Sequence, residues 1–512
     1  MTSATADSLQ TMITMKISLR IPARSIATLS LLAATAAGAQ RQTTPVPHAP
    51  PLPHAAPTSS RDRVYTGDQT SNTVSVIDAG TNILLGTIAL GDPRPGVLGA
   101  LYKKEIDVHG LGFSPDGKTL AAISVTSNAV TLIETATNRV RGTIYVGRAP
   151  HEAFFTPNGK ELWVAVRGEG YVSVIDPQAM RETRRIPTTD GVAMVIFRPD
   201  GKYAFVNSSR TAELTVVDVA SHRVVKRIAM PSPFSPNLAA SPDGQEVWVT
   251  LKDVGKTVIV DAQRLAVLGT IETGAITNHV NFVTTATDKL AYVTVGGENA
   301  VKVYRRNGGS PTLVTTIPVG DTPHGLWPSA DNASVYVGLE NADSVAVIDV
   351  ATQRVKAQIG IGQAPQALVF VANAVPSGPG TANLGRQNVG LRIERRMLSV
   401  PAAAMAKGKT VIRSLGAVDA VEISARQAPA GAMYDIYAVQ NMTAPYGKAV
   451  KLAHVMVKQD GTIDVAAQLQ FFASGFGNVV FTPEGQLPSG ATVSTIAVPV
   501  LQLASANHCS MH

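Results

Sequence analysis

Cysteine is almost absent from this sequence of 512 residues, in which Cys509 stands alone. No disulfide can form within the chain, so the apolar core has to stabilise the fold. Charged residues are also few, at 16% against 45% apolar residues, which excludes a long disordered chain. The formal net charge of +7 is small and spread over the chain, which disfavours nucleic acid as a partner. A chain of this length exceeds one ordinary core, so we expect two or more domains.

Several enzyme signatures are missing as well. The sequence has no Gly-x-Ser-x-Gly nucleophile elbow, no Cys-x-x-Cys-His haem attachment and no dinucleotide-binding glycine fingerprint. Its glycine-rich segments lie in predicted β-turns, with no helix behind them to hold a phosphate. Two arginine-rich stretches, 181–185 and 392–396, contain glutamate and are interpreted as solvated faces.

The N-terminal segment has the pattern of an export signal. Lys16, Arg20 and Arg24 form a basic region, the apolar run Ile26–Ala37 follows, and Ala-Gly-Ala gives a cleavage site before Gln40. The run is too short for a stable membrane anchor. The sequence therefore predicts an exported protein, in the periplasm or the medium, with no transmembrane segment after cleavage.

From Arg63 onward the chain repeats itself. An apolar, alternating strand that ends in an acid recurs at intervals of mostly 42 to 44 residues. The seven copies are Val74–Asp78, Val130–Glu134, Val172–Asp176, Leu214–Asp218, Val258–Asp261, the degenerate Val301–Arg305, and Val345–Asp349. This period is typical of a β-propeller with one blade per repeat. We therefore predict an all-β fold whose first large domain is a seven-bladed propeller.

Each repeat divides into four short strands separated by turn signals. In the second repeat, His109–Phe113 is the predicted inner strand and Ser-Pro-Asp-Gly the turn that follows it. The acid that ends each third strand is expected to cap the next turn. Arg63–Gly67 is a second strand without an inner strand before it, and Gln366–Val371 is an inner strand with nothing after it. Their pairing would complete one blade and close the ring.

The repeats resemble the YVTN-type β-propeller family, and with it the lactonase-like and cytochrome-d1-like propellers. The phrase that names the family stands here as Ala291–Val295 (AYVTV), with variants at Val64–Gly67, Leu162–Val166, Val247–Leu251 and Val335–Leu339. The resemblance covers about residues 63–372. It implies the fold, and the lactonase-like members imply a metal-assisted hydrolase at the channel mouth as one possible activity.

After Ala374 the repeat stops and short alternating strands follow, which predict a small β-sandwich. The predicted strands are Thr410–Ser414, Val418–Arg426, Met433–Val439, Val450–Val457, Thr462–Leu469, Val479–Thr482 and Val493–Val500. The predicted organisation is a signal peptide (1–39), a Pro/Ala-rich tether (40–62), the propeller (63–374), a linker (375–388), the sandwich (389–505) and a tail (506–512). An interaction module is the expected role of the sandwich.

Histidine recurs where one blade's outer strand enters the next inner strand. The seven positions are His109, His151, Ala193, Asn237, His279, His324 and Gln366. Their side chains are expected to ring one mouth of the channel. Converging imidazoles can bind Zn²⁺ or Cu²⁺ or carry protons, and Glu152 could be a base or a further ligand. Asn237 and Gln366 can also hydrogen-bond and are candidates for binding a ligand. Alternatively, the imidazoles hydrogen-bond neighbouring backbone, and these positions give the channel only generic polarity.

The insertion Gly91–Val108 breaks the repeat on the same face. Long insertions in repeats often form lids, so Arg94, Tyr102 and Lys103 are candidates for contacts with a ligand, and a tolerated surface loop is the alternative. Arg148 and Arg167 also lie near this face and could attract an acidic ligand.

Three functions are consistent with these patterns. The first is an exported scaffold that binds a protein, a glycan or a small molecule on the propeller face. The second is a metal-assisted hydrolase that uses the histidines and Glu152 at the channel mouth. The third is an envelope protein that binds metal or nucleic acid. The first needs no catalytic set and is the interpretation we prefer.

Overall fold

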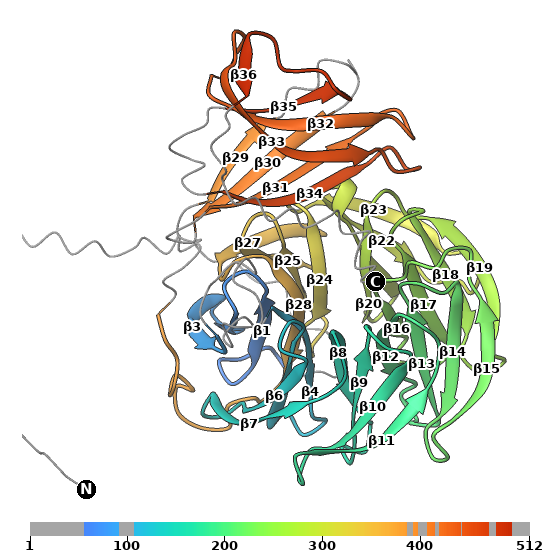
Figure 1. The fold of residues 1–512 in the computed structure, drawn as a ribbon. Helices are drawn as coiled ribbons and strands as arrows, with labels where there is room; N and C mark the ends of the chain where they lie inside the picture. The colour runs from blue at the N-terminus through green and yellow to red at the C-terminus, as the bar shows by residue number, and fades with distance from the viewer. Residues whose placement is uncertain are drawn as a thin grey trace, which may run out of the picture. The chain divides into compact units, whose positions relative to one another are not determined.

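The structure is a computed structural model that describes residues 56–91, 107–386, 393–397, 407–414, 419–441, 443–469 and 478–493. Seven four-stranded antiparallel sheets form a β-propeller (Figure 1). Written from the innermost strand outward, the blades are β28 (Pro365–Val371), β1 (Arg63–Asp68), β2 (Thr73–Asp78), β3 (Ile83–Ala89); β4 (Val108–Phe113), β5 (Thr119–Ser124), β6 (Ala129–Glu134), β7 (Arg139–Tyr145); β8 (Pro150–Phe155), β9 (Leu162–Val166), β10 (Tyr171–Asp176), β11 (Arg181–Pro187); β12 (Val192–Phe197), β13 (Tyr203–Ser208), β14 (Glu213–Asp218), β15 (Arg223–Ala229); β16 (Leu238–Ala240), β17 (Glu246–Leu251), β18 (Lys256–Asp261), β19 (Ala266–Glu272); β20 (Thr277–Thr284), β21 (Lys289–Val295), β22 (Ala300–Arg305), β23 (Thr312–Pro318); and β24 (Pro323–Pro328), β25 (Ser334–Leu339), β26 (Ser344–Asp349), β27 (Arg354–Gly360). A 3₁₀ turn, η2 (Gly296–Glu298), joins β21 to β22.

The ring closes as the sequence predicts. Strand β28 pairs antiparallel with β1, so that Val369 lies opposite Tyr65 and Val371 opposite Arg63. One blade is therefore built from both ends of the propeller, and β1 has a partner on each side. The predicted seven-bladed all-β fold is confirmed.

Burial follows from strand position. The three inner strands of each blade are almost wholly buried, whereas an outer strand such as β11 is exposed along most of its length. Trp163 and Trp248, in the second strands of two blades, are fully buried, and each indole N–H donates to a glutamate two residues earlier in the chain. The packed sheet faces between blades form the core, because an apolar side chain on either face of a blade meets a neighbouring blade.

The acids that end the third strands cap the following turns, as predicted. Asp78 Oδ1 accepts the backbone N–H groups of Gly80 and Thr81, at 2.9 and 3.1 Å. The same contact is made by Asp176, Asp218, Asp261 and Asp349. These carboxylates have a structural role.

Segments on both sides of the repeats are bound to the propeller. Thr58, from the predicted tether, donates its N–H to Asp331 at 2.7 Å. Asn138 Nδ2 donates to the carbonyl oxygens of Gly380 and Ala382, at 2.9 and 3.0 Å. Gly385 forms an isolated β-bridge with Thr87. Residues 379–385, which their composition indicates to be a linker, are therefore held against the first two blades.

The remaining strands form the predicted β-sandwich. One sheet has the order β29 (Ile393–Met397), β30 (Lys407–Ser414), β31 (Asp419–Arg426), β34 (Ile463–Leu469). The other has β35 (Asn478–Pro483), β32 (Met433–Val439), β33 (Gly447–Met456), β36 (Ala491–Val493). Ile423 and Val465 of one sheet share an apolar cluster with Ile436 and Phe481 of the other. Strand β29 falls in a stretch interpreted as a solvated basic face, and that interpretation did not include a strand.

Among the described residues, no helix is long and apolar enough to cross a membrane.

Candidate site at the propeller axis

The inner strands begin with a bulge that turns their first side chains. In β8, Pro150 lies opposite Val166 and Ala153 opposite Val164, so three steps along one strand match two along the other. The same shift occurs in β4, β20 and β24. A bulge re-aims the side chains of the residues within it. Here those residues include His151 and Glu152.

The four candidate histidines lie close together, and none has more than 9% of its surface exposed. The ring centroids of His109 and His151 are 4.2 Å apart, and those of His279 and His324 are 4.7 Å apart. A separation of 6.4 Å between His109 and His324 joins the two pairs. The imidazoles thus form one buried chain contributed by four blades.

The strand register corrects part of the predicted ring. Ala153 pairs with Val164, and the equivalent pairs are Leu238 with Val249 and Val280 with Val293. His151 lies two residues before Ala153. The residues two before Leu238 and Val280 are Pro236 and Asn278, so these two occupy the position that was predicted for Asn237 and His279. Asn237 and His279 are instead equivalent to Glu152. The prediction was displaced by one residue in these two blades, because neither contains the Pro-His phrase that marks the position of His151 and His324.

Two of the histidines are oriented by backbone carbonyls. His151 Nδ1 lies 2.8 Å from the carbonyl oxygen of Ala193, and His324 Nδ1 lies 2.8 Å from that of Gln366. A carbonyl oxygen only accepts, so Nδ1 carries the proton in both rings and each Nε2 keeps its lone pair. These two histidines therefore do hydrogen-bond neighbouring backbone, as the alternative interpretation expected. Each bond uses only one of the two ring nitrogens.

His279 has the opposite arrangement. Asn237 Oδ1 accepts the N–H of Val280 at 3.0 Å, which fixes the orientation of the amide. Asn237 Nδ2 then faces His279 Nδ1 at 3.2 Å and Met194 Sδ at 3.2 Å. The Nδ1 lone pair of His279 is thus occupied by an amide donor.

His109 and Glu152 form a buried pair with few partners. His109 Nδ1 has no hydrogen-bond partner among the described residues and lies 3.8 Å from Glu152 Oε1, beyond hydrogen-bonding distance. Burial raises the pKa of Glu152 to about 8, opposed by the backbone N–H of Leu111. Burial, with the nearby cations Arg167 and Lys252, lowers the pKa of His109 to about 3. Both groups are therefore neutral at pH 7, and the contact is no salt bridge.

A glycine makes room for this pair. A Cβ atom at Gly110 would lie 2.2 Å from the carbonyl oxygen of His151 and 2.5 Å from Glu152 Oε2. Any side chain at that position would displace the backbone of the next blade.

The other predicted residues fall into three groups. Gln366 is buried beside His324, and its Nε2 has no partner among the described residues. Arg148 is exposed, and its Nη2 donates to the carbonyl oxygen of Gly168 at 3.0 Å, away from the histidine chain. Arg94, Tyr102 and Lys103 lie outside the described residues.

Lys252 is a further residue of the site that the sequence analysis missed. It contributes to lowering the pKa values of His279 and His324. It follows β17 directly, as Arg167 follows β9, and the end of a second strand lies beside the start of its inner strand. This topology was the signal that could have identified it.

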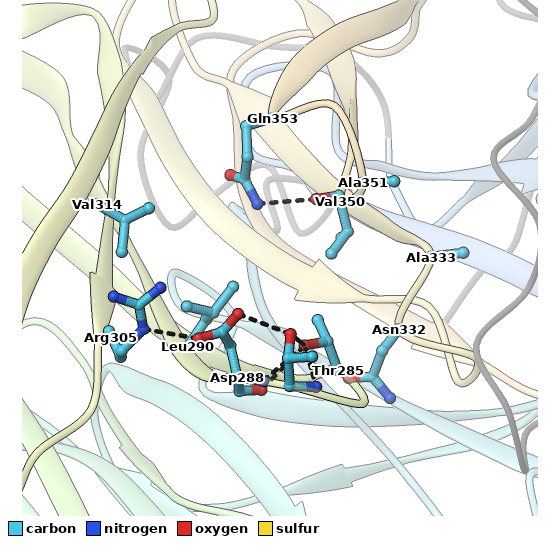
Figure 2. Close-up of a pocket in the computed structure, with 11 residues that line it drawn as sticks. Thr285, Asp288, Leu290, Arg305, Val314, Asn332, Ala333, Val350, Ala351 and Gln353 are labelled. Carbon is cyan, nitrogen blue, oxygen red and sulfur yellow. Dashed lines mark hydrogen bonds and ion pairs between the residues drawn. The ribbon is translucent and has the colours of Figure 1, made fainter.

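A separate cavity lies at the other end of the inner strands. It has a volume of about 330 Å³ and is lined by the turn after β20 together with Arg305, Asn332 and Gln353 (Figure 2). Its charged groups already pair with one another, since Arg305 Nε donates to Asp288 Oδ1 at 2.6 Å and Thr287 donates to Oδ2. We therefore place the candidate site at the histidine end.

The stretch Gly112–Thr119 has the spacing of a phosphate-binding loop, G-x-x-x-x-G-K-T. The structure places it in the turn between β4 and β5, where Asp116 accepts the hydroxyl of Ser114 at 2.6 Å. A strand follows it instead of a helix, so the helix N-terminus that would hold a phosphate is missing here.

The closed ring of sheets and its axial cluster define a seven-bladed β-propeller protein. Residues 130–373 match the model of the family described as YNCE-like beta-propeller. The resemblance to YVTN-type propellers is thereby confirmed. No curated protein matches the sequence.

Solved structures share the propeller at low sequence identity. A functionally unknown protein from Desulfotomaculum acetoxidans DSM 771 is 13% identical, with a TM-score of 0.51 over 60% of this chain and 98% of its own. The periplasmic gluconolactonase PpgL of Pseudomonas aeruginosa is 18% identical, with a TM-score of 0.49 over 61% and 99%. Hydrazine synthase of Kuenenia stuttgartiensis is 20% identical, with a TM-score of 0.47 over 51% and 89%. At 13% identity, the likeness to the Desulfotomaculum acetoxidans protein concerns the fold and not the activity.

Proposed function

We propose that this protein is an exported binding protein whose propeller holds a small acidic ligand at the histidine end of its axis. The observation that carries the proposal is a set of buried polar atoms without partners in a positive field. His109 Nδ1 and Gln366 Nε2 are both more than nine-tenths buried and unpaired within the described part of the chain. A buried polar atom without a partner costs about 1–3 kcal/mol, which a bound ligand would recover.

The charges favour an acid as that ligand. Among the described residues, Arg167 and Lys252 are the cations that act on the buried imidazoles, and the acid of the cluster, Glu152, is held neutral by burial. Cations and N–H donors around a concave site are the usual partners of a carboxylate. Export is supported by the basic and apolar N-terminal pattern.

The test is a carboxylate screen on chelator-treated protein. We expect at least one small carboxylate or sugar acid to raise the thermal unfolding temperature, with binding confirmed by calorimetry. The double variant Arg167→Gln/Lys252→Gln should lose at least tenfold in affinity. The matched control Arg184→Gln/Lys160→Gln removes the same charge from exposed positions and should bind like the wild type. The proposal is wrong if no carboxylate binds, or if both double variants bind equally well.

The hydrolase activity considered in the sequence analysis remains a prediction, separate from the proposed binding function. The same samples, incubated with lactones and analysed for ring opening, would show whether the axial site is also a hydrolase. Activity that Glu152→Gln abolishes while ligand binding survives would favour the enzyme.

A further inference from the structure

We propose that His109, His151 and Glu152 form a binding site for a divalent transition-metal ion, with Zn²⁺ the ion that this donor set suits best. The site lies within the axial histidine cluster and makes the proposed binding function more specific. It does not require the acidic ligand, because all three donors belong to the chain.

The first support is the distance between the donors. One ligand atom from each of the three residues lies within 4.8 Å of the other two, and His109 Nδ1 is 3.8 Å from Glu152 Oε1. Zinc binds imidazole nitrogen at about 2.0–2.1 Å, so tetrahedral ligands lie about 3.4 Å apart. The donors therefore need to close by little more than an ångström. They stand on β4 and β8, the inner strands of adjacent blades.

The second support is the orientation of His151. Metal-binding histidines usually donate their second ring N–H to a carboxylate or a backbone carbonyl, which fixes the tautomer. His151 makes this contact with the carbonyl oxygen of Ala193 at 2.8 Å. Its Nε2 is left with the lone pair that a metal ion requires.

The third support is that the other two donors are buried without a counter-charge, although the backbone N–H of Leu111 bonds Glu152. His109 Nδ1 is buried and has no partner among the described residues. The Glu152 side chain is 97% buried, since its exposure is 3%, and no cation contacts its carboxyl group in the described part of the chain. Two histidines and a glutamate are a common zinc ligand set that leaves one position open. That position is where water or the proposed acidic ligand would bind.

The other candidate histidines lie outside this set. His279 Nδ1 faces Asn237 Nδ2, and His324 is separated from His109 by 6.4 Å between ring centroids. Of the four histidines predicted as metal ligands, the proposed site therefore uses only His109 and His151, and Glu152 is its third ligand.

The experiment uses the mature chain, purified without an affinity tag, stripped with a chelator and dialysed. Zn²⁺ alone is titrated by calorimetry, and bound metal is measured by mass spectrometry. We expect about one equivalent, and a loss of at least about 100-fold in affinity for His109→Ala, His151→Ala and Glu152→Gln. His279→Ala is the matched control, because it removes an equally buried axial imidazole and should leave Zn²⁺ binding unchanged. Circular dichroism verifies that each variant is folded.

Co²⁺ gives a second measurement that needs no variant. Bound in place of Zn²⁺, it should show the intense visible d–d bands of a tetrahedral site in the wild-type protein. The metal site is wrong if folded wild-type protein binds neither ion at micromolar concentration, or if His279→Ala weakens binding as much as His151→Ala. Because the carboxylate screen is run on metal-free protein, failure of this site and failure of the proposed function are separate results.

Discussion

His324 Nδ1 donates to the backbone carbonyl oxygen of Gln366 across 2.8 Å, and this bond joins two neighbouring blades. His324 belongs to the last complete blade, whereas Gln366 starts the inner strand of the blade that β1 completes. The same side chain that lines the axis therefore also ties two neighbouring blades together, as His151 does through the carbonyl oxygen of Ala193.

Loss of that bond should weaken the contact between these two blades. In His324→Ala the buried carbonyl of Gln366 loses its donor, which should lower the free energy of unfolding by about 1–3 kcal/mol. Urea unfolding followed by circular dichroism measures this change. His324→Gln, whose amide can donate to the same carbonyl, should recover part of it. An unchanged midpoint in His324→Ala would show that the bond adds nothing to stability.

Gly110→Ala should destabilise the contact between two blades. The added methyl group would lie 2.2 Å from the carbonyl oxygen of His151, so the inner strand of the next blade has to move. Overpacking of this kind costs about 1–3 kcal/mol. Gly360→Ala is the control, because nothing lies within 4 Å of its Cβ position. Equal thermal unfolding temperatures for the two variants would contradict the prediction.

Asp68 should make the stability of the protein depend on pH. Burial raises the pKa of this carboxyl group from 3.8 to about 7, although the hydroxyls of Ser75, Thr66 and Thr73 oppose the shift. The folded state then binds more protons than the unfolded state between pH 4 and pH 7 or so. Its contribution to stability is therefore present below about pH 4 and is lost as the pH rises towards 7.

Asp68→Asn removes this titration. We expect the thermal unfolding temperature of the variant, relative to the wild type, to rise between pH 5 and pH 8. Asp218→Asn is the control, because the pKa of that exposed turn acid is lowered by the hydrogen bonds from Ser221, so its variant should show no such rise. A constant difference between Asp68→Asn and wild type across this range would rule out the shift.

Asn138→Asp should release the segment 379–385. The amide nitrogen of Asn138 donates to two carbonyl oxygens of that segment, and a carboxylate would repel both. Asn128→Asp is the matched control: Asn128 has the same backbone φ of 57° but uses its oxygen, which accepts the N–H of Ala149 at 2.9 Å. Limited proteolysis and hydrogen exchange should show faster cleavage and exchange in 379–385 for Asn138→Asp only.

The fold could be predicted from the sequence because each blade repeats the same local chemistry. Strand alternation, the Pro-Asp-Gly turns and the acid after each third strand recur often enough to fix the period. The unpaired strands at Arg63 and Gln366 then determine the closure. In the sandwich, strand β32 has the predicted bounds Met433–Val439. Strand β29 was not predicted, because the charged residues of Ile393–Met397 were interpreted as a solvated face.

The site was less predictable because it depends on a bulge. One extra residue in the inner strand decides which side chains reach the axis, and strand alternation does not reveal it. The bulge puts Glu152 beside His109 of the neighbouring blade, and no local pattern links residues so far apart in sequence. The register of the inner strands also places Asn237 and His279 at the position of Glu152, one residue from their predicted positions.

The pairing of β1 with β28 also constrains when the molecule can become complete during its synthesis. Strand β1 is synthesised first, and its inner edge has no partner strand until the chain has been extended to Val371. Until then the ring stays open and an apolar strand edge stays exposed. The blade that contains the first strands of the propeller is therefore the last one that can be completed, because its inner strand is synthesised after all the others.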